Sequence, residues 1–287
     1  MAYPIKHGFI AITPEISGPY TFNVEEYDSH TPSFNNIDHY CESLFRVLFD
    51  ENSWIKYIVL RNKKLSRKQY REFLVAFVHA WEFVIEAFLT TIPNNFEDAV
   101  ADSLSVELHN IVPKTIIHCD NEKQMQPIKL KNGDLDSFGN IINVYNEDCD
   151  PYFDGFHLTS SFVREIYSSK KLQEKLKVNT HFKTPTDTKG IIGASCHTEE
   201  DLFMAQEIGV DYCFLSPLKS TDKDYPNLSW SRFSKMVSNV NMPVYALGGL
   251  KFGDLETSRK YGAAGIAGIS MYTCLLYTSD AADEMRR

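Results

Sequence analysis

The sequence predicts an α/β fold in which eight parallel strands close into a (β/α)8 TIM barrel. Short apolar runs rich in β-branched residues alternate with stretches of helical periodicity along most of the chain. The length of 287 residues is also common for a single barrel of this class. An open doubly wound sheet is the alternative, but no GxGxxG motif follows the first predicted strand.

The predicted strands are the apolar runs at residues 8–13, 54–60, 114–119, 153–159, 190–196, 211–216, 243–247 and 264–269. Helices are expected at residues 36–49, 66–90, from Pro93 to about 109, 161–171, 199–208, 230–240 and 254–261. Ser66 is the expected N-cap of the long helix, and Pro93 ends it. Its large apolar side chains predict packing against the core, and they are Phe73, Phe77, Trp81, Val84 and Phe88.

Three segments fall outside this alternation. Residues 18–35 are rich in Pro, Ser, Asn and Asp and predict a loop, and residues 121–150 predict an insertion around a small strand at 141–145. The stretch 274–284 resembles the translation of a common sequencing-library adapter, so we expect 274–287 to be a non-native tail. We therefore expect one barrel domain over residues 1–273, which lacks its native eighth helix because the last strand ends near Ile269.

The composition of the chain argues against several classes of protein. The net charge of −9 argues against a nucleic-acid partner, because phosphate backbones attract basic surfaces. No stretch approaches the ~20 apolar residues of a membrane span, and the first residues contain no long apolar segment of a signal peptide. The six cysteines form no CxxC pair, which is typical of reduced thiols. These features together predict a cytoplasmic protein.

The candidate site residues follow the predicted strands, because the carboxyl ends of barrel strands meet at one mouth. They are Arg61, Lys63, Asp120, Ser195, His197, Thr221, Gly248, Gly249, Gly268 and Ser270. Glycines after the last two strands predict phosphate binding, because backbone N–H groups can then approach an anion closely. Tight turning alone is the alternative reason for these glycines.

The stretches GIIGASCHTEEDLFMAQEIGVDYCFLSPLKST, MPVYALGGL and YGAAGIAGIS lie within residues 189–270. This region resembles the thiamine phosphate synthase/TenI family of (β/α)8 barrels. Weaker similarity extends upstream through FDGFHLTS, TIIHCD and IVLRNK. Barrels of this family tend to pair, so the resemblance leaves a homo-oligomer open.

The resemblance implies roles for particular residues. Arg61 and Lys63 match the pair that grips a pyrimidine pyrophosphate in the synthases, and Ser195, Thr221 and Gly249 match other binding positions. Of the family's metal-binding acids, Asp120 is retained, but Phe162 stands where a second one is usual. The resemblance thus implies Mg2+ as a cofactor only if the chain is a synthase, and no other cofactor.

His197 falls where the TenI-like branch carries its catalytic histidine. The alternative is a histidine that simply enters a helix, since Thr198 is a plausible N-cap, and His157 is expected to be structural. The resemblance implies an enzyme of thiamine biosynthesis that binds a thiazole phosphate and moves a proton, as a thiazole tautomerase does. A thiamine phosphate synthase and a non-catalytic phosphate-binding barrel are the two alternatives.

Overall fold

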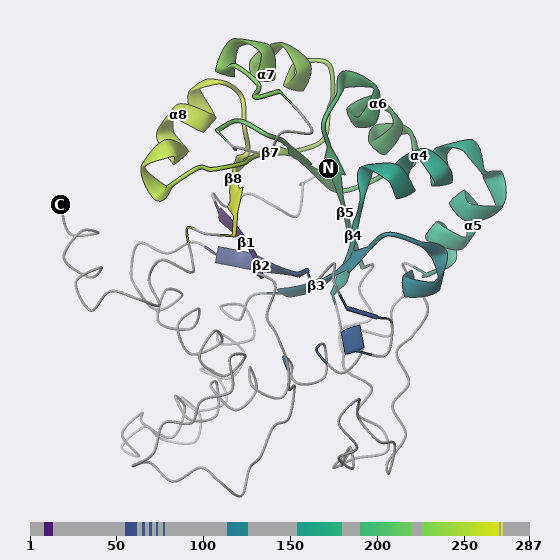
Figure 1. Ribbon diagram of the computed structural model, residues 1–287. Coiled ribbons are helices and arrows are strands. Elements are labelled where there is room, and N and C mark those ends of the chain that lie inside the picture. Colours follow the sequence, from purple (N-terminus) through teal and green to yellow (C-terminus); the bar gives the residue numbers. More distant parts are fainter. Residues whose placement is uncertain are drawn as a thin grey trace, which may run out of the picture.

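The computed structural model confirms the predicted barrel (Figure 1). Its strands are β1 (Phe9–Ile12), β2 (Ile55–Leu60), β3 (Lys114–Cys119), β4 (Gly155–Leu158), β5 (Ile191–Cys196), β6 (Tyr212–Leu215), β7 (Val244–Leu247) and β8 (Gly265–Gly268). The structure describes residues 9–13, 55–61, 65–66, 69–70, 73, 77, 114–125, 154–179, 190–219, 226–269 and 271.

Each strand pairs in parallel with the next one along the chain, and β8 pairs with β1 to close the sheet. Closure aligns Phe9 with Ile266 and Ala11 with Gly268. Because all eight strands are parallel, every carboxyl end lies at the same end of the barrel. This arrangement brings the predicted site residues that the structure describes to one mouth.

The helices α4 (Ser160–Ser168), α5 (Lys170–Asn179), α6 (Glu199–Glu207), α7 (Trp230–Val237) and α8 (Leu255–Lys260) form an arc outside the strands (Figure 1). Two short 3-10 helices are η2 (Glu122–Met125) and η3 (Phe252–Asp254). The prediction of one helix over 161–171 was wrong, because Ser169 adopts an extended backbone with φ −124° and ψ 105°. Its hydroxyl accepts a hydrogen bond from the Leu172 N–H at 3.4 Å, so the serine ends one helix and caps the next.

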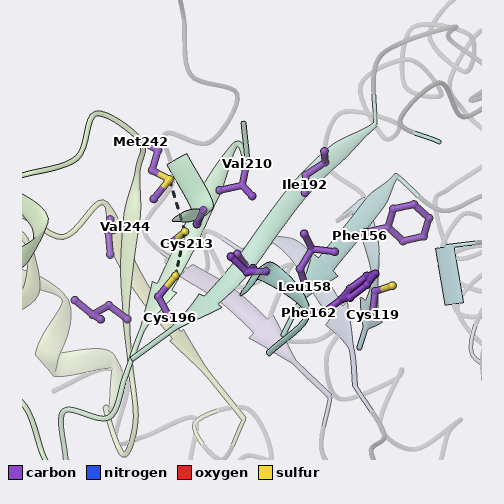
Figure 2. Close-up of a cluster of buried hydrophobic side chains, with 14 of the residues drawn as sticks. Cys119, Phe156, Leu158, Phe162, Ile192, Cys196, Val210, Cys213, Met242 and Val244 are labelled. Carbon is purple, nitrogen blue, oxygen red and sulfur yellow. Dashed lines mark hydrogen bonds between the residues drawn. The ribbon is translucent and has the colours of Figure 1, made fainter. Parts of the chain in front are cut away.

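Side chains alternate along each strand between an outer and an inner core. Figure 2 shows part of the outer core, where the sulfur atoms of Cys196 and Cys213 lie 3.6 Å apart and that of Met242 lies 3.6 Å beyond. Phe73 and Phe77 are fully buried in this outer layer, which confirms their predicted packing. The inner core includes Ile10, Ile12, Tyr57, Val59, Ile116, Tyr212, Phe214 and Tyr245.

Several predictions fall on residues outside the described part of the chain. These are the loop at 18–35, the helices at 36–49 and 93–109, the small strand at 141–145, the side chains of Trp81, Val84 and Phe88, and the tail at 274–287. The extent of the domain and the missing eighth helix therefore stay predictions. Of the insertion at 121–150, the described start forms η2. No helix within the described ranges is long and apolar enough to cross a membrane.

Candidate functional site

The mouth of the barrel gathers most of the predicted site residues. Those that the structure places there are Arg61 after β2, Asp120 after β3, Ser195 in β5, His197 after β5, Gly248 and Gly249 after β7, and Gly268 at the end of β8. Lys63, Thr221 and Ser270 lie outside the described residues. Thr13, directly after β1, fixes the backbone of Arg61 at the mouth. Its hydroxyl accepts a hydrogen bond from the Arg61 N–H at 2.7 Å and donates one to the Arg61 carbonyl at 3.0 Å.

The corner between β5 and α6 holds His197 in a network around a fully buried carboxylate. Asp201 accepts hydrogen bonds from the backbone N–H groups of His197 at 2.9 Å and Thr198 at 3.2 Å. The Thr198 hydroxyl accepts in turn from the Asp201 N–H, which completes a capping box and confirms the predicted N-cap. Arg164 of α4 neutralises the carboxylate through a contact of 2.7 Å. The backbone of His197 is therefore fixed from two helices.

The imidazole of His197 is oriented by the end of β6. Its Nδ1 lies 3.1 Å from the Ser216 carbonyl oxygen and 3.2 Å from the Ser216 hydroxyl. A carbonyl can only accept, so the contact favours the tautomer in which Nδ1 carries the proton and Nε2 carries the lone pair. This geometry agrees with both interpretations of His197, because the residue stands at a helix entry and its favoured tautomer leaves Nε2 unprotonated.

Ser195 is half-buried at the mouth and rests on an interior histidine. Its hydroxyl lies 2.9 Å from Nε2 of His157, whose Nδ1 lies 3.1 Å from the Tyr212 hydroxyl. The His157 ring also stacks on Phe214 with centroids 4.3 Å apart. Burial, followed by the nearby charges of His118 and Arg61, lowers the pKa of His157 well below its ordinary value. The ring is therefore neutral. Its contacts with Ser195, Tyr212 and Phe214 agree with the structural role that the sequence predicts for His157.

The Gly248–Gly249 turn requires glycine for its backbone. The φ angles are 113° at Gly248 and 64° at Gly249, in the left-handed region that side chains disfavour. A Cβ on Gly249 would lie 2.6 Å from the Lys219 carbonyl oxygen, and the Lys219 N–H donates to the Gly248 carbonyl at 2.8 Å. Tight turning thus accounts for both glycines by itself, and phosphate binding there stays a prediction.

The carboxylates expected to hold Mg2+ are not brought together. Asp120 is exposed and bonded to Asn121, while Phe162 is fully buried in the outer core. Asp154, which could have replaced the second acid, precedes β4 at the opposite end of the barrel, where it accepts from the Thr115 N–H at 2.9 Å. The insertion could also supply an acid, but its residues 126–150 lie outside the described part of the chain. Within the ranges that the structure describes, no group of three or more His, Cys, Asp or Glu could hold a metal. These residues do not fit the family's Mg2+ site.

Sequence reasoning missed two contributors to this site. Asp201 was not singled out, although Thr198 and an acid three residues later form a recognisable capping-box pattern. Tyr212 was assigned only to a strand. Its link to His157 joins residues 55 positions apart, and no local pattern reveals such a contact.

Comparison with known proteins confirms the resemblance. Residues 173–272 match the family model described as thiamine monophosphate synthase. Putative thiamine-phosphate synthase 2 of Aquifex aeolicus is 37% identical over 84 residues, which are 29% of this chain and 45% of that protein. Thiamine-phosphate synthase of Actinobacillus pleuropneumoniae is 33% identical over 107 residues, which are 36% of this chain and 48% of that protein. The matched stretches thus span about half the length of these curated relatives.

The solved structures support the fold. Thiamine phosphate pyrophosphorylase from Pyrococcus furiosus superimposes with a TM-score of 0.50 at 16% identity, covering 97% of this chain and 96% of that one. At this identity the similarity concerns the fold alone.

Proposed function

Starting from the match of residues 173–272 to the thiamine monophosphate synthase family, we propose that this chain is an enzyme of thiamine biosynthesis. It binds a thiazole phosphate at the mouth of the barrel and catalyses a proton transfer of the thiazole tautomerase type, with His197 as the acid–base group. The observation that carries this proposal is the contact of His197 Nδ1 with the Ser216 carbonyl, which favours a lone pair on Nε2.

The phosphate is held by the glycine turns and the cations of the rim. Backbone N–H groups at Gly248, Gly249, Gly268 and Ser270 approach the phosphoryl oxygens, as at other barrel phosphate sites. Arg61 and Lys63 supply positive charge from the end of β2, and Ser195 and Thr221 supply hydroxyls. These groups bind the phosphate, and His197 acts on the thiazole ring.

His197 performs the chemical step. A histidine is the side chain best suited to take up and return a proton near neutral pH. Its Nε2 removes a proton from one position of the bound thiazole, and the resulting imidazolium returns a proton at another, which yields the aromatic tautomer. The Asp201 network keeps the His197 backbone in place during the transfer, so the imidazole returns to the same orientation.

A synthase is the second candidate, because the curated relatives from Aquifex and Actinobacillus are named as thiamine-phosphate synthases. In that case Arg61 and Lys63 would grip a pyrimidine pyrophosphate, and the protein would join the pyrimidine to the thiazole. The burial of Phe162 and the remote place of Asp154 weigh against it, because neither position supplies a second carboxylate beside Asp120.

One assay separates the candidates. The purified chain is given the thiazole carboxylate phosphate alone, and then with the pyrimidine pyrophosphate and Mg2+. We expect tautomer conversion in the first mixture and its loss, by roughly 100- to 10,000-fold, in His197→Ala. Ser216→Ala is the matched control, because it removes a hydroxyl at 3.2 Å from Nδ1 but keeps the carbonyl acceptor.

The remaining outcomes identify the alternatives. A coupled product that requires both substrates and Mg2+ would favour the synthase. Binding of the thiazole phosphate without turnover in either mixture would favour the non-catalytic barrel. Conversion that survives in His197→Ala would refute the role of His197.

A further inference from the structure

We propose that Tyr212 and His157 are positioning residues that turn the Ser195 hydroxyl into a hydrogen-bond donor toward a bound phosphoryl oxygen. This inference rests on the proposed function, because it needs a phosphate at the mouth. The three side chains come from β6, β4 and β5 and form a continuous chain of contacts, with Tyr212 OH 3.1 Å from His157 Nδ1 and His157 Nε2 2.9 Å from Ser195 Oγ.

The direction of this chain of hydrogen bonds follows from which groups can donate a proton and which can accept one. A neutral imidazole has one donor and one acceptor nitrogen, so it donates to one hydroxyl and accepts from the other. Among the described residues, the Tyr212 hydroxyl forms its hydrogen bond with His157 alone, and it is fully buried inside the barrel. A buried O–H without an acceptor is costly. Tyr212 therefore donates to Nδ1, and Nε2–H donates to Ser195.

The opposite direction has a clear disadvantage. If the Ser195 hydroxyl donated to Nε2, then Nδ1–H would point at the Tyr212 oxygen and leave the phenolic proton without a partner in the apolar interior. The same direction would also present only a lone pair of Ser195 to the mouth. A phosphoryl oxygen is an acceptor, so that arrangement would repel the ligand rather than bind it.

The neighbouring residues are shaped to hold this chain. Gly193 lies beside Tyr212, and a Cβ there would sit 2.1 Å from the Tyr212 ring carbon Cζ. The phenol thus occupies the space that any side chain at position 193 would fill. Phe214 stacks on the His157 ring at a centroid distance of 4.3 Å and fixes its plane. Packing therefore holds both ends of the interior chain, while Ser195 reaches the mouth.

The first test needs no ligand. Long-range proton–nitrogen NMR correlation on the full chain with nitrogen-15 histidine reports which imidazole nitrogen of His157 carries the proton. We expect the Nε2–H tautomer in the unmodified protein. The Nδ1–H tautomer, or a doubly protonated ring, would overturn the inference whatever the protein binds.

The second test asks whether the hydrogen bonds from Tyr212 through His157 to Ser195 affect anion binding. Inorganic phosphate and inorganic pyrophosphate are titrated calorimetrically into the unmodified protein, Tyr212→Phe, Ser195→Ala and the double variant. We expect each single variant to bind the anions about tenfold more weakly, and the double variant to bind no more weakly than Ser195→Ala. A merely structural effect of Tyr212→Phe would add to the loss from Ser195→Ala.

The control is Tyr245→Phe, which removes a hydroxyl from another interior tyrosine whose ring lies edge-on to Tyr212 at 6.1 Å. It should bind both anions as the unmodified protein does. Unchanged binding in Tyr212→Phe, or additive losses, would overturn the inference while the proposed function stands. Absence of anion binding in the unmodified protein would instead count against the proposed phosphate site, and with it against the ligand role of Ser195.

Discussion

At both ends of the barrel, aspartate carboxylates accept hydrogen bonds from backbone N–H groups, but they connect different elements. At the amino end, Asp154 and Asp211 precede their strands and accept backbone N–H groups of the preceding strands, from Thr115 at 2.9 Å and from Ile192 at 2.8 Å. At the carboxyl end, Asp201 accepts the N–H groups of His197 and Thr198. The first pair joins strand to strand, whereas Asp201 joins a helix to the proposed reactive corner.

The two ends therefore differ in whether their aspartates affect stability alone or both stability and the proposed function. A carboxylate that ties two strands at the amino end stabilises the sheet and lies away from the mouth. A carboxylate that ties His197 to α6 stabilises the fold and also fixes the backbone that carries the imidazole. Changes at the amino end should therefore lower stability alone, and changes at the carboxyl end should lower both stability and the proposed activity.

The largest effect is expected from Asp201→Ala. The variant leaves the N–H groups of His197 and Thr198 without their acceptor and removes the ion pair between Asp201 and Arg164. Removing one partner of a buried pair costs about 3–5 kcal/mol, and the partial exposure of Arg164 reduces this to about 2–4 kcal/mol. Urea unfolding measures the loss, and the activity of the folded fraction should fall as well. Full activity in that fraction would contradict the positioning role at the carboxyl end.

The next effect concerns alkaline pH at the amino end. Burial, with the nearby charges of Asp154 and Asp211, raises the pKa of Tyr57 from 10.0 to about 12. Below pH 10 both states keep the proton, so this stability is fully present. Between pH 10 and pH 12 the unfolded state loses the proton first, so stability falls by about 2–3 kcal/mol as pH rises.

Urea unfolding at several alkaline pH values checks this expectation. Tyr57→Phe removes the ionisable group, so its stability should fall less steeply above pH 10 than that of the unmodified protein. Equal slopes for the two proteins would show that Tyr57 is not protected by the amino-end interior.

Asp154→Ala should show the separation most directly. The buried N–H of Thr115 loses its acceptor, which costs about 1–3 kcal/mol of unfolding free energy. Affinity for inorganic phosphate, measured by calorimetry on the folded protein, should stay unchanged because Asp154 is at the far end of the barrel. Asp211→Ala provides an independent repeat at the neighbouring strand pair. A fall in anion affinity in both variants would contradict the separation of the two ends.

Gly249→Ala should cost about 1–2 kcal/mol for its left-handed backbone and more for the collision with Lys219, and it should also weaken phosphate binding. The matched control is Gly209→Ala, because Gly209 also has a positive φ of 82° but no atom within 4 Å of its would-be Cβ. The two variants share the backbone strain, and only Gly249 adds the collision with Lys219. Equal effects on anion affinity would show that the Gly248–Gly249 turn has no part in binding.

Local sequence pattern predicted most of the barrel. All eight strands were found close to their observed bounds, because apolar runs with β-branched residues mark buried parallel strands independently of their partners. The split between α4 and α5 was missed, since Ser169 interrupts a stretch whose periodicity continues on both sides. Composition around one residue does not reveal whether its backbone will extend.

The site was predicted only in part for a related reason. Strand ends and glycines identified the mouth residues, because their position in the chain determines their position in a parallel barrel. The interior chain of Tyr212, His157 and Ser195 depends on the register between β4, β5 and β6. Register is a property of the assembled sheet, so these contacts could not be predicted from the sequence of any single strand.

The close fit between Gly193 and Tyr212 has a consequence for redesign. β5 carries no side chain at Gly193, and the adjacent strand β6 fills that volume with the phenol of Tyr212, whose ring carbon Cζ would lie 2.1 Å from a Cβ on residue 193. The two positions therefore behave as a single unit of volume. Libraries that aim to reshape the barrel interior should exchange them together, with a larger residue at 193 matched by a smaller one at 212. A larger residue at 193 alone would have to displace the Tyr212 ring, so we expect such single variants to be less stable than the paired ones.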